Sequence, residues 1–218
     1  MNPSYLKASL LLCAALGAVT ADATASVIDN TVITSSIRPF GYPDTATYGQ
    51  TFTVGADNVL NSFSMYLNGN DQTLNLRGYV AGWDGNKATS ILYTSATRAV
   101  TPGLGLMEFS FDTGKLSLTE GQKYVMFLSV SDLGEQATSL YTMPATNNSY
   151  AGGDFVYFNN SLNFGALTTQ RWDCTECGWG DVAFKAAFSA TTGEVPEPAS
   201  LALLGLGFAG MAALRRKA

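Results

Sequence analysis

The central part of the sequence alternates apolar and polar residues with a period of two, and no helical period is sustained anywhere between its two ends. Successive side chains of a strand point to opposite faces, so this alternation predicts half-buried β-strands. One run is different, because residues 123–130 are apolar on both faces and therefore predict a central strand covered on both sides. The clearest alternating runs are residues 50–54, 60–67, 74–80, 90–94, 107–111, 154–158 and 182–188.

Turn signals separate these runs at fairly regular spacing. Asn68-Gly69-Asn70 ends one run, and Asp84-Gly85-Asn86 ends another. About ten short strands joined in this way predict an all-β fold, namely a two-sheet antiparallel sandwich of jelly-roll-like connectivity. Residues 116–124 hold two apolar residues, a glycine turn and an aromatic residue entering a strand, and they resemble a corner of carbohydrate-binding-module-like jelly rolls.

The N-terminal segment is typical of an export signal. Lys7 precedes an apolar stretch from Ala8 to Val19, and Ala23 and Ala25 form a small-residue cleavage site. We expect a signal peptide over residues 1–25, cleaved after Ala25 with cleavage after Ala23 as the second choice. The alternative is an N-terminal membrane helix, but the apolar stretch is shorter than the roughly 20 residues that a span needs.

The C-terminal segment, residues 194–218, has three parts. The apolar part runs from Ala199 to Leu214, which is 16 residues or about 24 Å of helix. It predicts a single transmembrane helix with the basic end in the cytoplasm and residues 26–193, the β-sandwich ectodomain, outside. The alternative is a buried helix of the domain, which three basic residues directly after the apolar part disfavour. The two flanking parts are Val195-Pro196-Glu197-Pro198 and Arg215-Arg216-Lys217.

The order of Pro-Glu-Pro, glycine-rich apolar segment and basic end resembles the PEP-CTERM family. The resemblance implies a protein that is exported by a bacterium with an exopolysaccharide system and handled by an exosortase, a membrane transpeptidase. It also implies transient anchoring in the inner membrane, followed by a place at the cell surface or outside the cell. Residues 48–52, 150–153 and 181–184 are similar to the all-β ectodomains often attached to such tails.

Charge and composition exclude several classes of protein. Residues 26–195 hold 15 acidic and 8 basic residues, a net charge of −7, which opposes binding to nucleic acid. The chain has no histidine, so Ser-His-Asp and Cys-His catalysis and most zinc sites are excluded. Asp71 and Asp84-Gly85-Asn86 offer oxygen ligands for calcium, but turn chemistry explains them better. We expect no catalytic residue, no metal and no cofactor.

Cys174-Thr175-Glu176-Cys177 is the sharpest remaining motif. A redox C-x-x-C pair belongs at the start of a helix, whereas this one lies in a loop rich in glycine and tryptophan. A zinc site needs further soft ligands, and the only other cysteine, Cys13, leaves with the signal peptide. We therefore expect a structural disulfide between Cys174 and Cys177, with redox and metal roles as the alternatives.

Aromatic and acidic side chains gather near this motif. Trp172 and Trp179 are candidate carbohydrate contacts, because loop tryptophans stack on sugar rings, although most aromatic residues of a sandwich lie in its core. Asp173, Glu176 and Asp181 could supply the acid pair of a glycosidase. The leading expectation is a non-enzymatic surface or matrix protein. The alternatives are a carbohydrate-binding module for exopolysaccharide and, less favoured, a secreted glycosidase.

Overall fold

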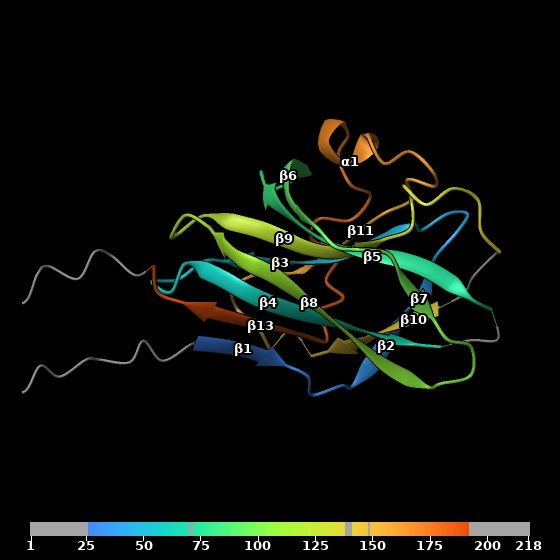
Figure 1. Cartoon of the computed structure of the whole chain (residues 1–218), viewed down its shortest axis with the longest axis horizontal. Coiled ribbons are helices and arrows are strands. Elements are labelled where there is room, and N and C mark those ends of the chain that lie inside the picture. The colour runs from blue at the N-terminus through green and yellow to red at the C-terminus, as the bar shows by residue number, and fades with distance from the viewer. Residues whose placement is uncertain (1–25, 70–71, 138–140, 148, 192–218) are drawn as a thin grey trace, which may run out of the picture. The chain divides into compact units, whose positions relative to one another are not determined.

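The computed structural model describes residues 26–69, 72–137, 141–147 and 149–191, which fold as a sandwich of two antiparallel sheets (Figure 1). The predicted all-β class and its two antiparallel sheets are confirmed, while jelly-roll connectivity stays a prediction. No helix in the described ranges is long and apolar enough to cross a membrane. The signal peptide over residues 1–25 and the segment from Ala199 to Leu214 lie outside those ranges and stay predictions.

The first sheet joins the start and the end of the described chain, because β1 and β13 pair from Ser26 opposite Phe188 to Asn30 opposite Phe184. β13 in turn pairs with β4, and β4 pairs with β8 on its other side. The strands of this sheet are β1 (Ser26–Asn30), β2 (Ser35–Phe40), β4 (Val59–Asn68), β8 (Leu106–Ser117), β10 (Tyr141–Thr146), β12 (Asp181–Val182) and β13 (Phe184–Ser189).

The second sheet is centred on β9, which lies between β3 and β5 and pairs antiparallel with both. β11 extends the sheet beyond β3, and β6 and β7 pair with β5. Its strands are β3 (Thr47–Thr53), β5 (Leu74–Trp83), β6 (Ala88–Thr94), β7 (Arg98–Val100), β9 (Lys123–Ser129) and β11 (Phe155–Phe158). One short helix, α1 (Ala166–Thr169), lies on the same side of the molecule as β6 in Figure 1.

Two hydrophobic clusters lie on the two faces of the second sheet. Met126 and Leu128 of β9 point into the main core between the sheets. Val125 and Phe127 point the opposite way, into a smaller cluster with Leu167 of α1. The alternation of strand side chains therefore buries both faces of β9, which confirms the expectation of a doubly covered strand.

The predicted and observed strands differ most where the sequence alternates least. Residues 131–153 hold few apolar pairs and many Asn, Thr and Gly residues, which predicts a surface loop with one strand around residues 140–143. β10 confirms that strand and extends it to residue 146, with five of its six residues buried. β1, β2 and β7 have no counterpart among the predicted strands. These strands are mostly exposed, so their sequences lack a strong apolar face. The single predicted run at residues 182–188 is divided in the structure between β12 and β13.

Candidate functional site

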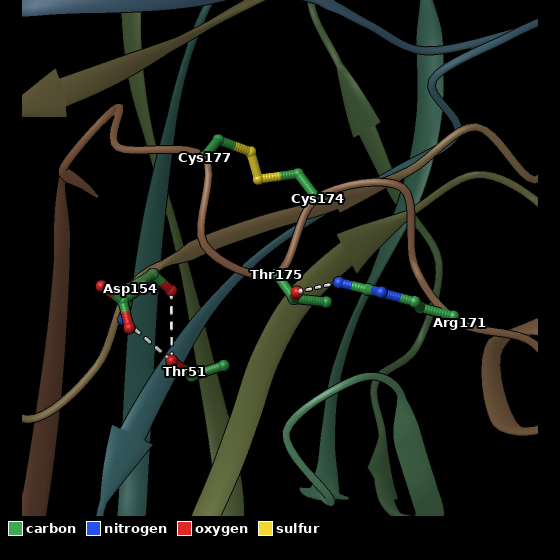
Figure 2. Close-up of a disulfide and its surroundings, with 6 residues drawn as sticks. All are labelled: Thr51, Asp154, Arg171, Cys174, Thr175 and Cys177. Carbon is green, nitrogen blue, oxygen red and sulfur yellow. Dashed lines mark hydrogen bonds between the residues drawn. A yellow bond between two sulfur atoms is a disulfide. The ribbon is translucent and has the colours of Figure 1, made fainter.

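A disulfide joins Cys174 and Cys177, as the sequence predicted, with a Cα–Cα distance of 5.6 Å (Figure 2). The pair lies in an extended loop after α1 and not at the start of a helix, the place that a redox C-x-x-C motif requires. Within the described ranges, no three metal-ligating residues come together. The disulfide thus fixes the shape of one surface loop.

Both ends of this loop are hydrogen bonded to β11. Cys174 and Tyr157 exchange two backbone hydrogen bonds, with N···O distances of 3.2 and 3.3 Å. At the other end, the backbone N–H of Phe155 donates to the carbonyl of Gly180 at 3.1 Å. The segment from residue 174 to residue 180 is therefore held against one edge strand of the second sheet.

Trp179 folds back over that strand. Gly178 and Gly180 on either side of it have φ angles of +70° and +77°, a conformation that side chains with a Cβ disfavour. The indole ring lies nearly parallel to the ring of Tyr157, with centroids 5.7 Å apart and an interplanar angle of 9°. It also stacks on Phe155 at 6.2 Å. Trp179 remains 52% exposed, so it presents an aromatic surface on a preformed support.

A hollow of about 410 Å³ opens beside this ring. Two of its lining residues are hydrogen bonded to each other, because Arg171 donates to the hydroxyl of Thr175 at 3.3 Å (Figure 2). Asp173 accepts the backbone N–H of Asn159 at 2.6 Å, which holds its carboxylate in place. The lining residues are Tyr157, Arg171, Asp173, Cys174, Thr175, Glu176, Cys177 and Trp179.

Trp172 is buried and cannot take the role that the sequence suggested. It is 1% exposed, and its ring packs edge-on against Trp83 and Phe127 and stacks on Phe158. Its indole N–H donates to the carbonyl of Leu167 at 2.9 Å. With no ring face open to solvent, Trp172 is a core residue, and the carbohydrate contact expected of the pair can rest on Trp179 alone.

The three acidic residues considered for glycoside hydrolysis do not share one site. Asp181 is fully buried, and its two carboxylate oxygens accept hydrogen bonds from the side chain of Gln50 and the backbone N–H of Tyr150 at 2.8 and 2.9 Å. Burial raises the pKa of Asp181, against the opposing effect of these hydrogen bonds. Asp173 and Glu176 alone face the hollow, so Asp181 is a structural residue.

The possible calcium turn is explained by its own hydrogen bonds. One oxygen of Asp84 accepts the backbone N–H groups of Asn86 and Lys87 at 2.8 and 2.9 Å. The other oxygen pairs with the ammonium of Lys87 at 3.1 Å. These contacts, led by the bond from Asn86, lower the pKa of the Asp84 carboxyl group. Asp71 lies outside the described ranges.

Sequence reasoning missed Tyr157 and Arg171 as members of the site. Tyr157 lies two residues after Phe155, so both point to one face of β11, and this alternation was a usable signal. Nothing local connected that face to Trp179, because the backbone bridge between Tyr157 and Cys174 joins segments that are 17 residues apart.

Comparisons with known proteins give one firm result. None of the curated proteins matches the chain. The structure of the clostridial cysteine protease Cwp84 after propeptide cleavage is 13% identical, with a TM-score of 0.48 over 77% of this chain and 40% of that one.

A second structure holds the cysteine protease and lectin-like domains of Cwp84, a surface layer associated protein of Clostridium difficile. It gives a TM-score of 0.38 at 13% identity and covers 68% of this chain and 33% of that one. The chain thus spans less than half of either protein, and likenesses this weak support no inference about it. Residues 194–217, in contrast, match the family model described as the PEP-CTERM protein-sorting motif, and the chain therefore carries a PEP-CTERM sorting signal at its C-terminal end.

Proposed function

We propose that this protein is a non-enzymatic surface protein, exported from the cell and delivered by its C-terminal signal. The observation that carries the proposal is the PEP-CTERM motif at residues 194–217, which implies export and membrane-associated sorting to the cell surface. In this proposal, Ala199 to Leu214 anchors the chain in the inner membrane for a time, and Arg215, Arg216 and Lys217 keep its end in the cytoplasm. An exosortase-type transpeptidase then acts near Val195, Pro196, Glu197 and Pro198.

The chemistry of the described residues supports a role without catalysis. The sequence has no histidine to act as a general base near neutral pH. The fully buried Asp181 is held by Gln50 and Tyr150, away from Asp173 and Glu176. The two sulfurs of the loop are joined to each other, which removes a thiol nucleophile from the hollow.

The test is the intact mass of the protein recovered from the envelope and from the medium of its native host. We expect a product that lacks residues 1–25 and everything after the Pro-Glu-Pro region. A matched pair of variants separates sorting from simple proteolysis. Glu197→Gln should block the second cleavage, whereas Glu135→Gln, an exposed acid of the sandwich, should leave the product unchanged. A mature mass that retains the chain from Ala199 to Ala218 would contradict the role of an exosortase.

A second candidate function is carbohydrate binding at the loop of the disulfide. The observation that favours it is Trp179, which is 52% exposed and stacked on Tyr157, since an aromatic ring held in this way can pack against the apolar face of a sugar. Trp179→Ala should abolish retention of the protein on exopolysaccharide purified from the host. The control is Leu104→Ala, an apolar residue that is 59% exposed in the turn between β7 and β8. Unchanged retention of Trp179→Ala would reject this function.

A further inference from the structure

Trp179 lines two hollows. The first, described above, lies on the side of the disulfide loop. The second has a volume of about 380 Å³ and is lined by Trp179 together with Ser35, Ser36, Ile37 and Arg38 of β2. Each volume lies within the range of about 300–1,000 Å³ that is usual for ligand sites.

The two hollows belong to different sheets. β2 pairs with β10 in the first sheet, and the disulfide loop is hydrogen bonded to β11 in the second. Of the described residues, Trp179 alone lines both hollows, so the two hollows share the indole ring. Together they are called the groove below, with one half on each sheet.

Each half carries polar groups that the described part of the chain leaves available. Neither Arg38 nor Arg171 forms an ion pair with a carboxylate there. Both are exposed, as are Ser36 and Glu176. Sugar hydroxyls both donate and accept hydrogen bonds, so a guanidinium, a carboxylate and a hydroxyl group around an aromatic ring form a lining that suits a sugar.

Charge favours a neutral ligand over an acidic one. Residues 26–195 carry a net charge of −7, which repels a polyanion at long range. Over the two hollows together, Arg38 and Arg171 are balanced by Asp173 and Glu176, so the lining itself gives a polyanion no net attraction. A chain of uronic acids would therefore meet repulsion where a neutral chain meets hydrogen-bonding groups.

We propose that this groove binds the interior of a neutral polysaccharide chain, with successive sugars on both sides of Trp179. One part of the chain contacts Arg171 and Glu176, and another contacts Ser36 and Arg38. The inference rests on the proposed carbohydrate function of Trp179 and adds to it the second hollow, a minimum ligand length and the charge class of the ligand.

The experiment measures binding of the full-length protein to fragments of the host exopolysaccharide. The fragments come from partial hydrolysis and are sorted by length and, on an anion exchanger, into neutral and acidic pools. We expect neutral fragments of four or more sugars to bind at least about tenfold more tightly than single sugars, because only they reach both hollows.

Substitutions in the second hollow distinguish the halves of the groove. Arg38→Gln and Ser36→Ala should each weaken binding of long neutral fragments about five- to tenfold, the loss expected for one or two hydrogen bonds, and leave binding of single sugars unchanged. Trp179→Ala should remove binding of both. Arg98→Gln, a change at an exposed arginine of β7, is the matched control and should have no effect.

Each contrary outcome has a separate meaning. The two-sided groove would be overturned if single sugars and long fragments bind with equal affinity and Arg38→Gln does not change the affinity for long fragments. The contact at Trp179 would then still stand. Binding confined to the acidic pool would overturn the neutral ligand class. If the unsubstituted protein binds no fragment of either pool, the groove and the underlying carbohydrate function are both wrong.

Discussion

Trp172→Ala is expected to destabilise the sandwich strongly, because it empties the centre of the smaller hydrophobic cluster. The indole ring lies between Trp83, Phe127 and Phe158, and only 1% of the residue is exposed. The substitution also leaves the carbonyl of Leu167 without the indole N–H that it accepts. The lost contacts join the second sheet to the segment around α1.

The size of the effect follows from the buried area. A buried tryptophan removes about 150–250 Å² from water, which at about 25 cal/mol per Å² corresponds to about 4–6 kcal/mol. Measured Trp→Ala and Phe→Ala changes in protein cores fall at about 3–5 kcal/mol. We therefore expect a loss of about 4 kcal/mol in the free energy of unfolding. For a domain of this length, that is a fall in Tm of about 8–16 °C.

Urea unfolding followed by circular dichroism measures this loss directly, with an unchanged m-value as the sign that the unfolded states are comparable. Trp179→Ala is the matched comparison, because the same residue type lies seven positions away but is 52% exposed. It should cost about 2–3 kcal/mol, since only roughly half the area is lost and no large cavity is left. Equal losses for the two variants, or a loss below about 1.5 kcal/mol for Trp172→Ala, would refute the assignment of Trp172 to the core.

Three further predictions test other parts of the structure. Alkylation followed by mass measurement should label no cysteine of the processed protein before reduction and two after it, because Cys174 and Cys177 are joined in the disulfide. Labelling without reduction would contradict this pairing. Gly153→Ala should cost more than about 2 kcal/mol, because the added Cβ would clash with the backbone carbonyl oxygen of Thr51. Gly55→Ala, where the added Cβ meets nothing within 4 Å, should be nearly neutral in the same unfolding assay. Burial, aided by Glu108, raises the pKa of Tyr66 to about 12 from the ordinary value of 10.0. The contribution of Tyr66 to stability is therefore complete below pH 10 and is lost as the pH rises through about 12. Tyr66→Phe should make the free energy of unfolding fall less steeply between these pH values, and an unchanged slope would contradict the assignment.

The sequence predicted those features that depend on local pattern. Alternating apolar residues placed most of the long strands, and the run at residues 123–130 was assigned to a doubly covered strand because it lacks a polar face. The disulfide was predictable for the same reason, since its cysteines are three positions apart. The sorting signal also needs no tertiary structure to be recognised, because it is a short stretch of consecutive residues.

The candidate site depends on contacts that no local pattern contains. Trp172 and Trp179 lie only seven positions apart outside any strand or helix, and only the fold places one in the core and the other on the surface. β2 supplies Arg38 and Ser36 to the groove although it lies more than 130 positions before Trp179 in the chain. Positions that are mostly exposed, as in β2, carry little apolar pattern from which a strand or its neighbours can be predicted.

The pairing of β1 with β13 has a consequence for how the protein reaches its folded state. The first strand of the sandwich is also the first to be synthesised, and its partner at residues 184–189 comes more than 150 positions later. The ladder between them cannot close until almost all of the chain is present, and such distant pairing is slow. A chain whose first strand is the last to pair keeps one side of its β13 strand unpaired until late in folding. The sandwich is complete only when the residues just before the sorting motif are available to pair with β1.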